Sequence, residues 1–231
     1  MESSVAIITA RGGSKRIPRK NIKLFLGKPI IQYSIEAAID SGCFTEVMVS
    51  TDDYEIAELA LKFGAKVPFM RSEKNSDDFS TTADVLIEVL ESYRQIGKQF
   101  ERFCCIYPTA PFVTPAKLSA GLNLLVDTGA DCVLPVLQFD YPIERCLRVE
   151  NNRAFMEYPD NYHLRSQDFS PAYHDAGQFY WLELSSFMEQ RVLFPKDTLP
   201  IITSHLEVQD IDTDEDWALA EFKYEYLKTV K

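Results

Sequence analysis

Residues 5–21 read Val-Ala-Ile-Ile-Thr-Ala-Arg-Gly-Gly-Ser-Lys-Arg-Ile-Pro-Arg-Lys-Asn, and this stretch decides the fold. The apolar run at 5–9 predicts a short buried strand, and the glycine pair behind it predicts a loop at the strand's carboxyl end. In an open α/β sheet, ligands bind just beyond the carboxyl ends of the strands. The stretch therefore predicts a strand followed by a ligand-binding loop.

This loop has the chemistry of a phosphate site. Gly12 and Gly13 allow backbone N–H groups to approach an anion closely. Arg11 and Lys15 can neutralise phosphate oxygens, one with a planar fork and the other as a point charge. The loop matches neither the Walker A pattern GxxxxGK[ST] nor the dinucleotide pattern GxGxxG. A basic surface turn is the alternative, but it does not account for paired glycines directly after a buried strand.

Segments typical of strands and helices alternate through the first two-thirds of the chain. Further strands are predicted at 46–50, 65–69, 103–106 and 132–136. Helices are predicted at 29–41, 54–63 and about 115–128, and another begins after Ser80 or Thr81, either of which can act as its cap. Repeated βα units predict an α/β fold with a doubly wound, mostly parallel sheet, Rossmann-like and covered on both faces.

The alternation breaks after Val136. Residues 138–171 are rich in Asp, Asn, Arg, Tyr and Pro and lack helical periodicity, which predicts an insertion of short strands and irregular chain. A strand at 177–182 and a closing helix at about 213–227 then restore the pattern. We therefore expect one catalytic domain, residues 1–137 and 172–231, with an inserted arm at 138–171.

The composition is that of a soluble globular protein, because 46% of the 231 residues are hydrophobic and 26% are charged. A formal net charge of −11 disfavours nucleic acid or an anionic membrane as the main partner. We expect no secretory signal, because only a short apolar run without preceding basic residues stands near the first residue, and no membrane span, because no apolar run approaches about 18 residues. Its five cysteines include no CxxC pair, which favours reduced thiols. We expect a cytoplasmic protein.

The basic residues are concentrated in one place. Seven lie between Arg11 and Lys28, and no acidic residue lies among them. In an otherwise acidic protein, such a segment is expected to face an anion.

Asp210-Ile211-Asp212 is the second feature that indicates chemistry. Two carboxylates at this spacing can bind Mg²⁺, which takes one or two protein carboxylates and otherwise binds water and phosphate oxygens. The alternative is structural: Asp212 or Thr213 caps the last helix, and Asp216 completes a capping box after Thr213. Spacing alone leaves both interpretations open.

Polar and aromatic residues concentrate at 165–168 and 172–181. Aromatic rings stack on the C–H faces of sugars while polar groups bind hydroxyls, so these segments predict a sugar site. The alternative for His174 is a partly buried structural histidine.

Four separated motifs resemble the CMP-sialic acid synthetase family of cytidylyltransferases, and together they span nearly the whole chain. The family's loop pattern ARxGSKxxxxKN is matched at Arg11, Gly13, Ser14, Lys15, Lys20 and Asn21. The other motifs are Val-Ser-Thr-Asp at 49–52, Tyr-Pro-Thr-Ala-Pro at 107–111 and Asp-Ile-Asp-Thr at 210–213.

The resemblance implies that CTP and a nonulosonic acid are the substrates and that Mg²⁺ is the cofactor. It implies nucleotide binding by Arg11, Gly13, Ser14, Lys15, Asn21, Arg71 and Ser80. It implies metal binding by Asp210 and Asp212, and catalytic roles for Arg11, Lys15 and Asp212. The sugar-binding residues that we expect are Tyr107, Arg145, Arg165, His174, Gln178 and Tyr180. It further implies a homodimer in which the arm passes Arg165 into the neighbouring subunit's site.

The sugar-side motifs depart from those of sialic acid synthetases. Tyr107 stands where the family has Gln, Glu144 with Arg145 beside it stands near the family's carboxylate-binding Lys, and residues 172–181 resemble the pseudaminic acid members. Pseudaminic acid is therefore the predicted sugar. N-acetylneuraminic acid, legionaminic acid and Kdo remain alternatives, as does a non-catalytic nucleotide-binding subunit.

Overall fold

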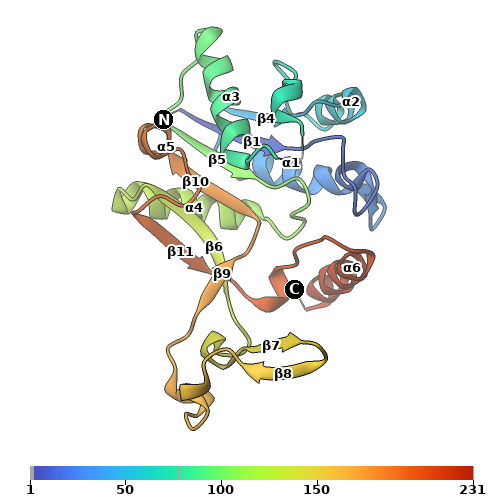
Figure 1. Ribbon diagram of the computed structural model, residues 1–231. Helices are drawn as coiled ribbons and strands as arrows, with labels where there is room; N and C mark the ends of the chain where they lie inside the picture. Colours follow the sequence, from blue (N-terminus) through green and yellow to red (C-terminus); the bar gives the residue numbers. More distant parts are fainter. Residues whose placement is uncertain (1–2, 78, 231) are drawn as a thin grey trace.

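The computed structural model describes residues 3–77 and 79–230, and its centre is a seven-stranded sheet (Figure 1). The strand order is β11-β6-β10-β5-β1-β4, and β9 pairs with β6. The strands are β1 (Ser4–Thr9), β4 (Glu46–Ser50), β5 (Arg102–Ile106), β6 (Cys132–Gln138), β9 (Tyr173–Asp175), β10 (Phe179–Glu183) and β11 (Thr198–Ile202). This confirms the predicted α/β fold.

The sheet is mixed, although parallel pairs form its framework. β1 runs parallel to both β4 and β5, and β6 runs parallel to β11. β10 lies between β5 and β6 and is antiparallel to both. The carboxyl ends of β1 and β5 therefore lie side by side, with the start of β10 next to them.

Helices cover both faces of the sheet, as predicted. They are α1 (Ile30–Ser41), α2 (Tyr54–Lys62), α3 (Thr82–Gln95), α4 (Pro115–Thr128), α5 (Leu184–Gln190) and α6 (Asp214–Thr229). Because successive strand side chains point to opposite faces, Ala6 and Ile8 pack with α1, α2 and α4, while Val5 and Ile7 pack with α3 and α5. α6 packs on the aromatic cluster that includes Phe25 and Trp217.

Local sequence signals set the ends of these helices. Thr81 caps α3 in a capping box with Asp84, and Thr213 caps α6 in the same way with Asp216. Gly121 allows α4 to lie close to the sheet, because a Cβ there would stand 2.7 Å from the Trp181 ring.

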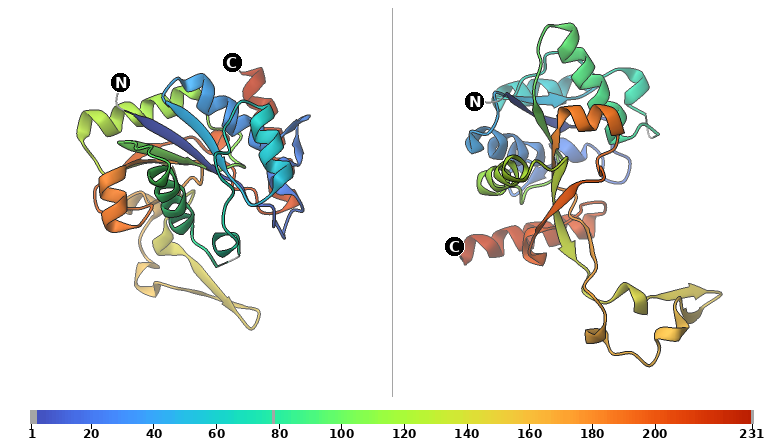
Figure 2. Two further views of the ribbon diagram at one scale, coloured as in Figure 1. Left: turned by 90° about the horizontal axis from the view of Figure 1, so that it is seen from above. Right: turned by 90° about the vertical axis from the view of Figure 1, so that its left-hand side faces the viewer.

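Residues between β6 and β9 project from the sheet as the arm, which Figure 2 shows extending away from the helices. It contains the antiparallel hairpin of β7 (Leu147–Glu150) and β8 (Arg153–Met156). Asn151 and Asn152 form the turn with φ of 50° and 60°, the left-handed conformation that tight hairpin turns require. The 3₁₀ turns Ile143–Arg145, Pro159–Asn161 and Ser166–Asp168 complete the arm.

Several elements differ from the sequence-based prediction. The strand predicted at 65–69 is wrong: only a single parallel bridge, between Met48 and Lys66, forms there. β11, α5 and the short hairpin of β2 (Leu24–Phe25) and β3 (Lys28–Pro29) were not predicted. The remaining 3₁₀ turns are Lys20–Ile22, Glu73–Asn75 and His205–Glu207.

All five cysteines carry free thiols, as predicted, and Cys104, Cys105 and Cys132 are buried in the sheet. Within residues 3–77 and 79–230, no helix has both the length and the apolar character that crossing a membrane requires.

Candidate active site

A cavity of about 390 Å³ lies at the carboxyl ends of β1 and β5. Its lining comes from the loop after β1, the first turn of α3 and the loop after β5. The lining residues are Thr9, Arg11, Ser14, Lys15, Arg16, Ile17, Lys20, Asn21, Thr82, Tyr107, Pro108 and Thr109. The fold therefore places the basic loop where an α/β sheet binds its ligand.

The seven basic residues between Arg11 and Lys28 divide into two groups. Four of them line the cavity: Arg11, Lys15, Arg16 and Lys20. The other three are held by acidic side chains outside it, since Arg19 pairs with Asp53 and Glu55, Lys23 with Asp214, and Lys28 with Glu36. Four cations around one cavity of this size provide a site for a polyanion.

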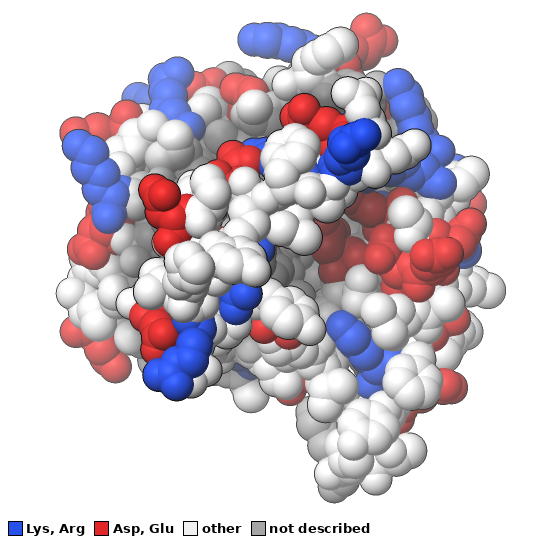
Figure 3. All heavy atoms as spheres, turned by 60° about the horizontal axis from the view of Figure 1, so that its bottom comes forward, with Lys and Arg blue, Asp and Glu red and all other residues white. Residues whose placement is uncertain are grey.

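Charge is unevenly spread over one face of the molecule. Figure 3 shows Asp and Glu side chains gathered in a dense group at one side of the face drawn, beside a hollow, with Lys and Arg in smaller groups elsewhere. This face therefore carries a concentration of acidic groups, in contrast to the single basic surface typical of nucleic-acid-binding proteins.

The two loop glycines have different roles. The N–H of Gly12 donates to the Asp52 carboxylate at 2.9 Å, and a Cβ at Gly12 would stand 2.6 Å from an Asp53 oxygen. Gly12 therefore lets the loop pack against the end of β4, and its N–H is already bonded within the protein. Gly13 is open, with no described atom within 4 Å of the Cβ position. Gly13 is exposed, but neither of the two predicted anion-binding glycines is among the residues that line the cavity.

Asn21 fixes the shape of the loop from within. Its side chain is 5% exposed, and its amide donates to the Arg11 carbonyl at 2.8 Å. Asn21 also lines the cavity, together with the predicted residues Arg11, Ser14 and Lys15. The structure thus brings these predicted nucleotide-binding residues together.

Arg71 and Ser80 lie outside the lining of this cavity. Arg71 is 8% exposed, and its guanidinium donates to the Ser50 hydroxyl at 3.1 Å and to the Ser50 carbonyl at 2.6 Å. Burial lowers its pKa, although the charges of Asp52 and Glu88 act in the opposite direction. The Ser80 hydroxyl donates to Asp77 and to the Lys74 carbonyl. Thr82, two residues further on, is the hydroxyl residue of this helix start that lines the cavity.

The two carboxylates of 210–212 lie next to the basic loop. Asp212 is 2.5 Å from the Arg16 guanidinium and 3.5 Å from the Lys20 ammonium, which also donates to the Ile211 carbonyl at 2.7 Å. Thr213 caps α6 in a capping box with Asp216, which confirms this form of the structural alternative, whereas Asp212 does not act as the cap. Burial raises the pKa of Asp210, and the charge of Asp212 raises it further.

The Asp210 and Asp212 carboxylates can hold Mg²⁺ only if other ligands complete the coordination of the ion. Among the described residues, no group of three or more His, Cys, Asp or Glu side chains is arranged to hold a metal ion. The charge of Asp212 raises the pKa of Asp210, so the two carboxylates lie close together. Near a polyanion site, such a pair matches the preference of Mg²⁺ for one or two protein carboxylates supplemented by phosphate and water oxygens. Asp210 and Asp212 are the residues that would hold it.

On the sugar side, the predicted residues occupy three different environments. Tyr107 and Tyr180 lie together with ring centroids 5.5 Å apart, and Tyr107 lines the cavity. Gln178 is 3% exposed, and its amide donates to the Glu207 carbonyl at 2.6 Å, while its side-chain oxygen is buried without a partner among the described atoms. His174 is exposed and packs on Phe139 with centroids 4.8 Å apart.

The two predicted arginines of the arm do not line this cavity. Arg145 donates to the Ser166 hydroxyl at 3.2 Å, and Arg165 pairs with Asp168 at 3.6 Å. Both belong to the arm and lie outside the lining of this cavity.

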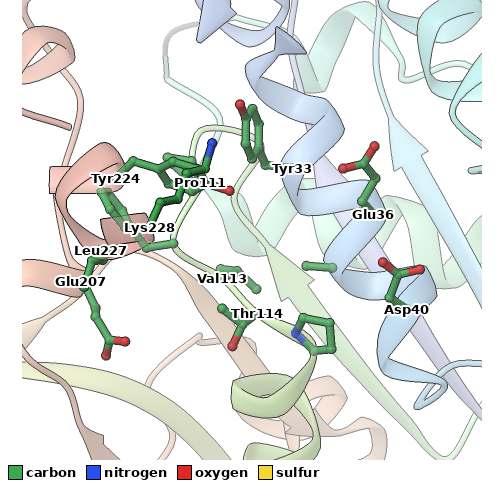
Figure 4. A pocket seen from close by; sticks show the side chains of 13 residues that line it. Tyr33, Glu36, Asp40, Pro111, Val113, Thr114, Glu207, Tyr224, Leu227 and Lys228 are labelled. Carbon is green, nitrogen blue, oxygen red and sulfur yellow. The ribbon is translucent and has the colours of Figure 1, made fainter. Parts of the chain in front are cut away.

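A second cavity, of about 260 Å³, lies between α1, the loop before α4 and α6 (Figure 4). Figure 4 shows Glu36 and Asp40 on α1 and Glu207 on the opposite side. Three carboxylates repel a triphosphate. We therefore assign the nucleotide to the first cavity, whose charged lining residues are all cationic.

The sequence reasoning missed three features of the site. Arg16 and Thr82 were not candidates, and Lys20 was noted in the loop motif without a role. The signal for Arg16 and Lys20 was the density of basic residues directly after the glycines. For Thr82, the signal was a run of three hydroxyl residues at a helix start, in which only the position of the cap decides which one faces inward.

Comparisons with known proteins agree with this geometry. A family model described as Cytidylyltransferase matches residues 5–215. The chain is 42% identical over 225 residues to the pseudaminic acid cytidylyltransferase of Campylobacter jejuni subsp. jejuni serotype O:2, covering 96% of each chain. It is 32% identical over 220 residues to the CMP-N,N'-diacetyllegionaminic acid synthase of Legionella pneumophila, covering 94% of each.

A solved structure supports the fold. CMP:2-keto-3-deoxy-manno-octonic acid synthetase, complexed with CTP, superposes with a TM-score of 0.68 and 18% identity, covering 99% of this chain and 100% of that one. The match of the family model over most of the sequence, together with these relatives, shows that the chain belongs to the cytidylyltransferase family.

Proposed function

We propose that this cytidylyltransferase transfers CMP from CTP to the anomeric hydroxyl of pseudaminic acid and releases pyrophosphate. The observation that carries the proposal is the cavity at the carboxyl ends of β1 and β5, which four cations and the aromatic side chain of Tyr107 line together. The cations suit a triphosphate. Tyr107 lies between the cavity and the polar and aromatic residues around β9 and β10.

In the proposed reaction, the anomeric hydroxyl attacks the α-phosphorus of CTP and pyrophosphate leaves. Arg11 and Lys15 would bind phosphate oxygens and stabilise the charge that develops on them, because fixed cations in a preformed site need no reorganisation during the reaction. Phosphoryl-type transfer depends mainly on positioning and electrostatics. Mg²⁺, held by Asp210 and Asp212, would supply further neutralisation of the phosphates.

Pseudaminic acid is favoured over other nonulosonic acids for two reasons. The relatives that are 42% and 43% identical to this chain bear that activity in their names, whereas the legionaminic acid synthase is 32% identical. On the sugar side, the aromatic ring of Tyr107 lines the cavity, which suits a sugar with deoxy positions. Each hydroxyl buried without a partner costs roughly 1–3 kcal/mol.

The arm supports a homodimer. Its hairpin exposes Leu147 and Val149, and Phe155, Tyr158 and Tyr162 are exposed as well. An apolar surface of this kind is typical of an interface. In such a dimer, the arm would carry Arg165 towards the partner subunit's cavity. We further propose that the enzyme works in the cytoplasm.

A sugar panel tests the substrate. Purified protein with CTP and Mg²⁺ is offered pseudaminic, legionaminic and N-acetylneuraminic acids and Kdo, and products are identified by mass. We expect kcat/KM for pseudaminic acid to exceed that for N-acetylneuraminic acid by about 10²-fold or more, the ratio that one unpaired buried hydroxyl produces. Equal or better turnover of N-acetylneuraminic acid would reject the sugar assignment. A lack of pyrophosphate release with every sugar would instead indicate a non-catalytic nucleotide-binding subunit.

A further inference from the structure

The segment that carries Asp210 and Asp212 is irregular chain. Residues 208–213 lie between the 3₁₀ turn His205–Glu207 and α6, and they belong to no strand or helix. Their backbone groups have no ladder of regular hydrogen bonds to join, so side chains or water must bond them instead. The position of the two carboxylates therefore depends on the side chains that hold this segment.

Lys223 on α6 folds back onto this segment. Its ammonium donates to the Val208 carbonyl at 2.8 Å and to the side-chain oxygen of Gln209 at 3.0 Å. Val208 is 5% exposed, so the first of these bonds holds a buried part of the segment. An ammonium has three donors, and Lys223 gives two of them to the two residues that precede Asp210.

Gln209 continues this connection to the carboxylate residues. Its side-chain amide donates to the Asp210 carbonyl at 3.1 Å and to the Asp216 carboxylate at 3.2 Å. Asp216 in turn accepts from the N–H of Asp212 at 3.2 Å. Because an ammonium can only donate, Lys223 keeps the Gln209 oxygen on its own side and turns the NH₂ group towards Asp210 and Asp216.

The segment is also held from the basic loop. Lys20, which lines the cavity, donates to the Ile211 carbonyl at 2.7 Å and lies 3.5 Å from the Asp212 carboxylate. Lys223 and Gln209 are not among the residues that line the cavity. Lys20 therefore faces both the segment and the site of the phosphates, whereas the contacts of Lys223 and Gln209 described above serve the segment itself.

We infer that Lys223 and Gln209 are positioning residues that hold Asp210 and Asp212 where the two carboxylates bind Mg²⁺ beside the triphosphate. The inference rests on the proposed function, since it assumes that these carboxylates hold a metal ion. Hydrogen-bonded groups behind metal ligands typically contribute roughly 10–100-fold to metal affinity. Lys223 and Gln209 act on the backbone of the ligands, so we expect an effect at the lower end of that range.

CTP binding with and without a metal ion tests the inference on the full chain. Equilibrium dialysis measures the Kd for CTP in EDTA and in Mn²⁺, which like Mg²⁺ suits carboxylate and water ligands. Sugar is left out, so no turnover occurs. The metal gain, defined as the Kd in EDTA divided by the Kd in Mn²⁺, measures how much CTP binding strengthens when the ion is present. Asp212→Asn, which removes a proposed ligand, sets the largest loss of this gain.

Lys223→Met and Gln209→Leu should each lower the metal gain about tenfold. Their Kd values in EDTA should stay within about twofold of native, because the basic loop still binds the phosphates. The double variant should lose little more than either single variant, since both changes break one connection. Lys223→Arg keeps a cationic donor and should retain part of the gain.

Lys228→Met is the matched control. Lys228 lies on the same helix, but its ammonium stacks over the Tyr224 ring at 4.8 Å from the centroid. This variant should keep the native metal gain, and thermal melts followed by circular dichroism check the fold of every variant.

The possible outcomes separate the inference from the proposed function. A metal gain within about twofold of native in both Lys223→Met and Gln209→Leu, while Asp212→Asn loses the gain, would overturn the inference and leave the metal site standing. Equal losses of CTP affinity in EDTA and in Mn²⁺ would also overturn it, since they indicate that the two residues only stabilise the fold. If Asp212→Asn keeps the native gain, or the native protein has none, the metal part of the proposed function fails and the inference fails with it.

Discussion

The guanidinium of Arg16 lies 2.5 Å from the carboxylate of Asp212, a residue 196 positions later in the chain. This contact joins the loop after β1 to the segment that leads into α6. Because the Arg16 side chain is 70% exposed, the pair adds little to stability, about 0–1 kcal/mol. Its importance is instead that cations for a triphosphate and carboxylates for a metal ion belong to one site. Variants on either side should therefore change activity without unfolding the protein.

The carboxylate pair gives the first prediction. Asp212→Asn should nearly abolish turnover while leaving the fold intact, and Asp210→Asn should be less severe, because Asp212 is the carboxylate closest to the basic loop. The measurement is pyrophosphate release during a titration with Mg²⁺, with circular dichroism to check the fold. Native rates for both variants at limiting Mg²⁺ would leave the pair without a metal-binding role.

Asp210 also has a predictable effect on stability. Burial and the charge of Asp212 raise its folded pKa above the unfolded value, so the folded state disfavours the ionised form. The free-energy cost of ionising Asp210 in the folded state is absent below the unfolded pKa and grows as the pH rises through the folded pKa. Asp210→Asn removes it, so the variant should have a Tm at pH 7 equal to or above that of the native enzyme. A clearly lower Tm at pH 7 would contradict this account.

Two cations of the cavity give the third prediction. Arg11→Ala and Lys15→Ala should each remove about 3 kcal/mol of transition-state stabilisation, since each takes away a charged donor to phosphate. The expected result is a fall of roughly 10²-fold in kcat/KM for CTP. Lys28→Ala is the matched control, because Lys28 pairs with Glu36 outside the cavity. If Arg11→Ala and Lys15→Ala behave like this control, the basic loop does not bind CTP.

The sequence predicted many of the strands and helices because their bounds depend on local signals. The bounds of β4 follow directly from an apolar run, and α4 begins at a proline after a capping threonine and ends at a glycine. The strand predicted at 65–69 does not form, although this segment is similarly apolar. Pro68 has no N–H to donate to a neighbouring strand, and the chain makes only one bridge there. An apolar run thus predicts burial more reliably than strand pairing.

The candidate site was predicted in part for the same reason. Arg11, Ser14, Lys15 and Asn21 lie on one short loop, so a local motif was enough to group them. The contact of Arg16 with Asp212 and the packing of Tyr107 against Tyr180 join residues far apart in sequence. The contact of Tyr107 with Tyr180 depends on β10 running antiparallel beside β5, and a hydrophobic pattern does not encode strand direction.

The arm gives a prediction about assembly. Val149 is 71% exposed on the hairpin, so Val149→Asp should prevent an interface that the hairpin forms, without disturbing the α/β domain. Light scattering at micromolar concentration should show a dimer for the native protein and a monomer for this variant. Leu61→Asp, at an exposed apolar position on α2, is the control. A monomeric native protein would reject the dimer, and with it the role of Arg165 in the partner's site.

Glu46 gives the final prediction, which concerns acid stability. Its side chain is buried at the start of β4, where it accepts hydrogen bonds from the Tyr93 hydroxyl at 2.6 Å, from Lys98 at 2.6 Å and from Lys66 at 2.9 Å. Burial alone would raise the pKa of Glu46, but the bonds from Lys98, Tyr93 and Lys66 outweigh it and lower the pKa to about 2.

A carboxylate with a lowered folded pKa stabilises the protein above its unfolded pKa, and this contribution is lost as the pH falls from the unfolded value of 4.5 towards 2. The shift corresponds to about 3 kcal/mol at neutral pH. Glu46→Gln should therefore be less stable than the native protein at pH 7, and the difference should shrink at pH 3. Urea unfolding at pH 7 and at pH 3 measures this difference in the free energy of unfolding. Glu58→Gln, at an exposed position, is the control. A difference between native and Glu46→Gln that stays constant with pH would show that the two lysines and Tyr93 do not stabilise an ionised Glu46.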